Sequence, residues 1–294
     1  MNVLILGASG LVGGNALTYL SQVPGYSVRG THFTFATNTT YFFNTADLDD
    51  LANTAVLADF TPDVVVHCGA LTFVDYCESH PEESYSKTVD STANALKLAK
   101  RYQAKLIYIS TDYVFDGKQG PYLEEAPTNP VCVYGHHKLA AEQLVAASGL
   151  PYLILRITNV YGTELRGKNF VARLLQQMQQ QERISLKLPF DQYATPINAL
   201  DIARAIQYLL DHEKRGIYHL ASTDYLNRYQ LADRIVSKFR YNNTELLPIT
   251  TASLAQPARR PLSAGLLAHK FLRDFPEFRF TTIDEFLTNC ESPC

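Results

Sequence analysis

The stretch MNVLILGASGLVGG, residues 1–14, joins a short apolar run to a glycine-rich turn and the beginning of a helix pattern. The run VLIL predicts a buried strand. Gly7 permits a tight turn after it, Gly10 lets the backbone approach a pyrophosphate, and Gly13 allows the helix to pack closely on the strand. The first N–H groups of the helix and its positive dipole end favour an anion. We therefore expect this turn to bind a dinucleotide through Gly7, Ser9, Gly10, Leu11, Val12 and Gly13.

The same alternation of apolar runs and helix patterns continues through the first half of the chain. Several runs are apolar without alternation, as in a parallel sheet covered on both faces. Helix patterns between such strands imply right-handed βαβ crossovers. We predict an α/β fold with a doubly wound parallel sheet of the Rossmann type. Its strands lie at 3–6, 26–33, 63–68, 105–110 and 152–157, and its helices at 11–22, 47–60, 82–102 and 134–148.

The pattern changes after about residue 160. Helical segments persist at roughly 168–182, 198–212 and 228–240, but the strands become short and prolines interrupt the chain. We assign residues 1–160 to an NAD(P)-binding domain. Residues 161–294 form a smaller substrate-binding lobe, some of whose segments return to the main sheet.

Composition argues against nucleic acid, membranes and metal ions as partners of this chain. The 294 residues carry a formal charge of −3, which argues against nucleic acid because phosphate binding needs a basic face. No apolar run reaches the roughly 18–20 residues that span a membrane. The five cysteines are scattered without metal-type spacing, although Cys290 and Cys294 could pair at the tail. We expect a cytoplasmic protein without a metal site, monomeric or homodimeric.

The end of the second strand indicates which cofactor is used. An acidic residue there would hold the ribose 2′-hydroxyl of NAD, whereas a basic residue favours the 2′-phosphate of NADP. The sequence has no acid at residues 30–33. Arg29 and His32 could face a phosphate or could be solvated strand-end residues. We therefore favour NADP, with NAD as the alternative.

A second sequence pattern indicates catalytic residues. The strand at 105–110 ends in Ser110-Thr111, and Tyr134 and Lys138 follow with a spacing that places them on one helix face. A phenol of pKa ~10 is a poor acid or base at neutral pH, but an adjacent cation favours the phenolate. Thr111 could orient a substrate carbonyl toward that phenol. These three residues are the candidate catalytic set.

With these motifs in place, the chain resembles the extended short-chain dehydrogenases/reductases, and within them the dTDP-4-dehydrorhamnose reductases. The resemblance covers nearly the whole length. STDYVFDG followed by Y-x-x-x-K is specific for this branch, whereas the glycine motif is not. The matching stretches are GASGLVG, PDVVVHCGALTFVDYCE (62–78), STDYVFDG (110–117), YGHHKLAAE (134–142), LRITNVYG (155–162), KNFV (168–171), the Thr195-Pro196 pair and RPLSAGLLAHK (260–270).

The resemblance implies a reductase of a 4-keto sugar nucleotide. Tyr134 would donate a proton to the ketone, Lys138 would bind the nicotinamide ribose and lower the tyrosine pKa, and Thr111 would complete the triad. Asn44 and Thr45 would lie against the adenine. Cys68, Gly69 and Ala70 would lie along the cofactor, and the substrate would contact Thr72, Thr111, Asp112, Tyr113, Asn159 and Arg260.

Departures from the family pattern keep other functions open. Those reductases usually have asparagine at His67 and at Asp90, and an aromatic residue at Asn159. A catalytically silent NADP-binding regulatory subunit, similar to the β subunit of methionine adenosyltransferase, is one alternative. A reductase of another small carbonyl substrate is a second. Dehydration is disfavoured because Asp112 is followed by Tyr113 and not by a second acid.

Overall fold

The centre of the molecule is a seven-stranded parallel sheet. The structure is a computed structural model that describes residues 1–50 and 53–290, so the suggested pairing of Cys290 with Cys294 lies outside it. The strand order is β11-β6-β5-β4-β1-β2-β3, and every adjacent pair is parallel. The strands are β1 (Asn2–Leu6), β2 (Ser27–His32), β3 (Thr40–Phe42), β4 (Val64–His67), β5 (Lys105–Thr111), β6 (Tyr152–Ile157) and β11 (Gly216–His219).

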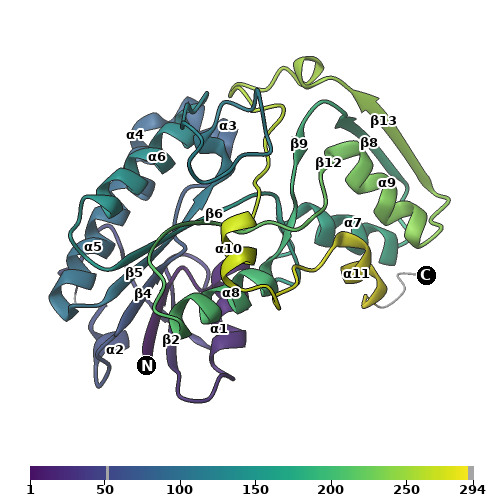
Figure 1. Cartoon of the computed structure of the whole chain (residues 1–294). Coiled ribbons are helices and arrows are strands. Elements are labelled where there is room, and N and C mark those ends of the chain that lie inside the picture. The colour runs from purple at the N-terminus through teal and green to yellow at the C-terminus, as the bar shows by residue number, and fades with distance from the viewer. Residues whose placement is uncertain (51–52, 291–294) are drawn as a thin grey trace.

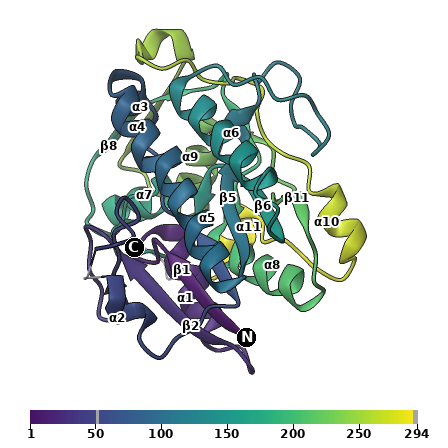
Figure 2. The ribbon, with the colours of Figure 1, turned by 90° about the vertical axis from the view of Figure 1, so that its left-hand side faces the viewer.

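Helices cover both faces of this sheet (Figures 1 and 2). On one face a buried apolar core joins the sheet to α1 (Leu11–Leu20), α8 (Ala199–Asp211) and α10 (His269–Asp274). On the other face a second core joins it to α2 (Thr54–Leu57), α5 (Ser91–Tyr102) and α6 (Val133–Ala146). The central strands are buried on both sides, which explains their unbroken apolar runs. The predicted doubly wound parallel sheet is confirmed.

Two local predictions differ from the structure. The helix expected at 47–60 is reduced to the single turn of α2. The Asn53 amide group donates to the carbonyl oxygens of Asn44 and Asp47, so polar side chains close turns there instead of a helix. The helix expected at 82–102 is present but built from α4 (Pro81–Tyr85), a π-helical turn at Ser86–Asp90 and α5. A short helix, α3 (Val74–Ser79), precedes it.

The smaller lobe has its own core, formed mainly by residues after Tyr161 (Figure 1). Its main strands β8 (Ile184–Pro189) and β13 (Thr244–Ile249) pair in parallel, and helices α7 (Phe170–Gln179), α9 (Arg228–Lys238) and α11 (Ile283–Thr288) pack with them. Short pairs join β7 (Val160–Tyr161) to β10 (Ile197–Asn198) and β9 (Tyr193–Ala194) to β12 (Leu226–Asn227). Two segments from this part of the chain return to the main sheet, as expected. Helix α8 packs on its face, and β11 is its edge strand beside β6.

No helix within residues 1–50 and 53–290 combines the length and the apolar character needed to cross a bilayer.

Candidate active site

A cavity of about 580 Å³ lies at the carboxyl ends of β1, β4 and β5. Polar groups that follow neighbouring parallel strands meet at this edge, which is where open α/β sheets bind ligands. The cavity brings together the glycine turn, the segment after β4 and the three candidate catalytic residues. Among its lining residues are Gly7, Ser9, Gly10, Leu11, Val12, Gly13, Cys68, Gly69, Ala70, Thr111, Tyr134 and Lys138.

The glycine turn has the geometry of a diphosphate cradle. Gly7 adopts φ +82°, a conformation that favours glycine, and a Cβ there would lie 3.1 Å from the backbone nitrogen of Gly69. A Cβ at Gly13 would lie 2.4 Å from the carbonyl oxygen of Gly7, so helix and strand approach as closely as expected. Within the described residues no side chain caps the amino terminus of α1. Its first N–H groups therefore remain available to an anion.

Lys138 is a buried cation beside the catalytic residues. Its Nζ donates a hydrogen bond to the carbonyl oxygen of Ile109 at 2.6 Å and lies 4.1 Å from the centroid of the Tyr108 ring. Burial lowers the pKa of Lys138 to about 7, because a charged ammonium loses its hydration there. The lysine is therefore only partly charged near neutral pH.

Tyr134 is also buried, and it lines the same cavity as Thr111. Burial raises the pKa of the phenol above its ordinary value of 10, an effect that outweighs the opposing influence of the nearby Thr111 hydroxyl. The expected net lowering of this pKa by Lys138 is thus wrong for this structure. The physical reason is that both groups are desolvated, and the lysine itself has lost part of its charge.

The Asp112 carboxylate accepts hydrogen bonds from the candidate catalytic residue Thr111 and from Thr158. Thr111 Oγ1 donates to Asp112 Oδ1 at 3.1 Å, and Thr158 Oγ1 donates to Asp112 Oδ2 at 2.7 Å. Burial raises the pKa of the Asp112 carboxyl. A hydroxyl has one proton, and Thr111 donates it to Asp112 in this structure. Thr111, Asp112 and Tyr113 all line the cavity. The family resemblance implied that these three residues contact the substrate.

Several residues predicted to bind the cofactor lie outside the cavity lining. Arg29 donates to the carbonyl oxygens of Val56 and Ala58, at the end of α2, so it does not face a phosphate. His32 Nδ1 lies 2.9 Å from Thr40 Oγ1 of the neighbouring edge strand. The remaining two, Asn44 and Thr45, hydrogen-bond through backbone and side-chain groups to Asn53, Ala46 and Asn94.

Sequence reasoning missed part of the lining near the end of β2. Phe33 and Thr34 follow that strand directly, and Arg166 and Lys168 reach the same cavity from the loop before α7. The Arg166 guanidinium lies 5.3 Å from the centroid of the Phe35 ring, which places its charge beside the segment after β2. Lys168 begins KNFV (168–171), one of the stretches that carry the family resemblance, but that resemblance gave it no role. Arg166 belongs to no motif, and basic side chains in loops are usually solvated.

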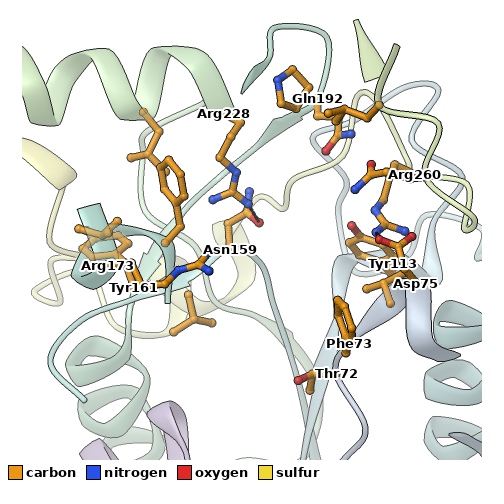
Figure 3. A pocket seen from close by; sticks show the side chains of 18 residues that line it. Thr72, Phe73, Asp75, Tyr113, Asn159, Tyr161, Arg173, Gln192, Arg228 and Arg260 are labelled. Atoms are coloured by element: carbon orange, nitrogen blue, oxygen red, sulfur yellow. Dashed lines mark hydrogen bonds and ion pairs between the residues drawn. The ribbon is translucent and has the colours of Figure 1, made fainter. Parts of the chain in front are cut away.

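A second cavity of about 500 Å³ adjoins the first (Figure 3). Thr72, Tyr113 and Asn159 line both cavities, and Arg260 lines the second. These are four of the residues predicted to contact the substrate. Asn159 has φ +40°, a left-handed conformation that asparagine tolerates better than most residues.

The fold and the cavity together define a Rossmann-type α/β protein. A family model described as "RmlD substrate binding domain" matches residues 1–289. This chain therefore belongs to the RmlD substrate-binding domain family, and the resemblance drawn from its motifs is confirmed.

The chain is similar both to dTDP-4-dehydrorhamnose reductases and to methionine adenosyltransferase 2 beta subunits. The chain is 33% identical over 310 residues to the dTDP-4-dehydrorhamnose reductase of Burkholderia thailandensis, covering 95% of this chain and 96% of that protein. It is also 33% identical over 269 residues to methionine adenosyltransferase 2 subunit beta of Bos taurus, covering 90% and 79%. A Bacillus anthracis dTDP-4-dehydrorhamnose reductase, solved in complex with NADP, superposes with a TM-score of 0.83 at 25% identity, covering 98% and 97%.

Proposed function

We propose that this protein is an NADP-dependent reductase of a 4-keto sugar nucleotide. The observation that carries the proposal is the convergence of Thr111, Tyr134 and Lys138 on the cavity that also contains the glycine turn. A structural role for a buried tyrosine and lysine would not require that shared position. The similarity to dTDP-4-dehydrorhamnose reductases over nearly the full chain supports the same chemistry.

The cavity lining fits a dinucleotide. The turn at Gly7–Gly13 would hold the diphosphate, and Lys138 would hold the nicotinamide ribose. NADPH, when bound, would supply the reducing equivalents. Arg166 and Lys168 provide positive charge beside the end of β2, where the 2′-phosphate of NADP lies in this fold class. They take the place that we first gave to Arg29 and His32, and they favour NADP over NAD.

The side chains can deliver a proton to a carbonyl oxygen. The raised pKa of Tyr134 keeps the phenol protonated at neutral pH, which is the form that a proton donor needs. As the proton leaves, the Lys138 ammonium and a hydrogen bond from Thr111 would stabilise the phenolate. Asp112 would hold Thr111 in place through the 3.1 Å hydrogen bond. Burial of these groups excludes water and strengthens each interaction.

The test is oxidation of NADPH by purified protein in the presence of 4-keto sugar nucleotides, followed by absorbance. Tyr134→Phe is expected to lower turnover by at least about 100-fold, the usual contribution of a general acid. Its melting temperature should still rise with NADP, because the phenol is not part of the glycine turn. Equal turnover by the wild type and Tyr134→Phe would refute the assigned role of Tyr134.

The regulatory-subunit alternative is supported by one observation, the 33% identity to methionine adenosyltransferase 2 subunit beta. It predicts that the wild type and Tyr134→Phe are equally inert with every keto sugar nucleotide. It also predicts that a methionine adenosyltransferase catalytic subunit co-purifies with both. Turnover by the wild type that Tyr134→Phe removes would exclude a silent protein.

A further inference from the structure

Three stretches of the sequence have no part in the proposed mechanism, yet the structure brings them together. They are FDG (115–117), the Thr195-Pro196 pair and PLSAGLL (261–267). The last of these lies between the segment that follows β5 and the segment that contains β9. We call the three neighbouring segments the connecting strip, which consists of residues 117–122, 262–267 and 193–195.

Backbone hydrogen bonds join the middle segment of the strip to the segment that follows β5. The Ser263 N–H donates to the carbonyl oxygen of Gly117 at 2.7 Å, and the Gly120 N–H donates to that of Ser263 at 2.9 Å. The Tyr122 N–H donates to the carbonyl oxygen of Gly265 at 3.0 Å. A Cβ at Gly120 would lie 2.2 Å from the carbonyl oxygen of Ser263, so this close approach requires glycine.

Thr195 joins the middle segment to β9, which pairs with β12 in the smaller lobe. Its hydroxyl accepts a hydrogen bond from the Leu266 N–H at 2.8 Å and donates to the Leu266 carbonyl oxygen at 3.2 Å. Gly265 has φ +94°, and a Cβ there would lie 3.1 Å from the backbone nitrogen of Thr195. The Tyr193 N–H donates to the carbonyl oxygen of Leu262 at 2.6 Å. The buried hydroxyl and the glycine therefore fix the distance between these two segments.

The segments of the strip lead directly to residues that line the second cavity. Tyr113 precedes the first segment, Arg260 precedes the middle one, and Gln192 precedes β9. Arg228 follows β12, and Figure 3 shows it across the cavity from the other three. Arg260 is also held by Asp75 of α3, Nη2 to Oδ2 2.8 Å. The strip therefore determines how the walls of this cavity stand relative to one another.

We infer that Thr195 and Gly265 are positioning residues of the proposed reductase, which hold the walls of the second cavity at a fixed separation through the connecting strip. This inference rests on the proposed function and adds residues outside both cavity linings to it. A substrate displaced by about 1 Å relative to Tyr134 can react roughly 100-fold more slowly, so the separation of the walls affects the rate. None of the strip's residues, all of which the structure describes, lines the first cavity. Cofactor binding should therefore not depend on the strip.

The experiment compares variants in steady-state NADPH oxidation, with the 4-keto sugar nucleotide that the wild type reduces fastest. Thr195→Val keeps the shape of the side chain but removes the acceptor of the buried Leu266 N–H. Gly265→Ala adds a Cβ against Thr195 and tests the same strip if Thr195→Val does not fold. Thr195→Ser keeps the hydroxyl. The matched control is Thr88→Val, because Thr88 is fully buried and its hydroxyl has no hydrogen-bond partner among the described residues.

Thr195→Val and Gly265→Ala should each raise the KM for the sugar nucleotide and lower kcat/KM by roughly 10- to 100-fold. The Kd for NADP, measured by calorimetric titration, should stay the same. Thr195→Ser and Thr88→Val should have the KM of the wild type. A role in folding alone would lower the melting temperature and leave the KM of the folded protein unchanged.

The inference is overturned if Thr195→Val and Gly265→Ala both turn over with the KM and kcat of the wild type. Failure of the proposed function would look different, because the wild type itself would then oxidise NADPH with no 4-keto sugar nucleotide. Amide hydrogen exchange decides the inference in that case. Thr195→Val should exchange faster than the wild type in the peptides around Tyr113, Arg260 and Arg228, but not in β1. Faster exchange confined to the neighbours of residue 195 would overturn the inference.

Discussion

Lys138 places an ammonium group in a buried part of the active-site cavity, 2.6 Å from the carbonyl oxygen of Ile109. Its pKa in the folded state is about 7, below the ordinary 10.5. Between these values the unfolded chain binds more protons, so the lysine's contribution to stability rises with pH from about 7 toward 10.5. Below pH 7 Lys138 is protonated in both the folded and the unfolded state, so burying its charge then destabilises the fold to the full extent.

We therefore expect Lys138→Met to remove this pH dependence. The difference in melting temperature, wild type minus variant, should become more positive between pH 7 and pH 9. Scanning calorimetry of both proteins across that range is the measurement. A constant difference would show that the Lys138 ammonium is not desolvated in solution. Turnover should be lost in the variant at every pH, because the proposed contact of Lys138 with the nicotinamide ribose is removed.

A second prediction at the scale of single residues concerns Arg166, on which the proposed preference for NADP over NAD rests. Arg166→Gln removes the charge beside the segment after β2 and should raise the Kd for NADP by about tenfold, one charge-assisted contact. The Kd for NAD should change little, since NAD has no 2′-phosphate. Isothermal titration with both cofactors makes the comparison, with Arg101→Gln, an exposed arginine in the last turn of α5, as the control. Equal losses for the two cofactors would contradict the assignment.

At the scale of elements, a buried ion pair joins α6 to β6. Arg156 Nη2 lies 2.7 Å from Glu142 Oε2, and both side chains are at most 4% exposed. Ser110 at the end of β5 donates to the same carboxylate. The network holds the helix that carries Tyr134 against the strands that form the cavity floor.

Glu142→Gln would leave the Arg156 charge buried without its partner and should lower the free energy of unfolding by about 3–5 kcal/mol. The control is Glu245→Gln, which breaks the exposed pair with Arg183 and should change it by about 0.5 kcal/mol or less. Urea unfolding of both variants and the wild type gives the values. Similar small losses in both would mean that the buried network does not hold α6.

At the scale of the whole molecule, two histidines are buried in a neutral state. His67 and His219 are fully buried, and burial lowers the pKa of each to about 3. Below pH 6.5 the unfolded chain binds protons that the folded chain does not, so stability falls as the pH falls from 6.5 toward 3. The His67 Nε2 contact with Ser91 Oγ, at 3.1 Å, explains how a histidine replaces the usual asparagine here.

The expected result is a steep loss of the free energy of unfolding in urea between pH 6.5 and pH 4. His67→Asn should be less stable at pH 7, because the smaller side chain leaves a void, but its pH dependence should be shallower. The free energies of unfolding of the wild type and His67→Asn should therefore converge as the pH falls. Parallel curves would show that His67 is not kept neutral by burial.

Much of this architecture was predictable from local pattern. The five strands that were expected in the first half all occur, and the glycine turn and the Y-x-x-x-K helix follow the strands to which they were assigned. The edge strand β3 was missed, since three residues are too few for a pattern. The helix at 47–60 was overpredicted, since its polar residues hydrogen-bond locally.

The sequence by itself determined the sheet, the glycine turn and the placement of the Y-x-x-x-K helix after β5, because each depends on neighbours within a few residues or on one strand–turn–helix unit. Tertiary structure alone decided which charges face the cavities. It pairs Arg260 with Asp75, turns Arg29 toward α2, and brings Arg166, Arg173 and Arg228 to the linings of the two cavities. The physical reason is that charge pairing and desolvation depend on contacts between distant segments, which no local pattern records.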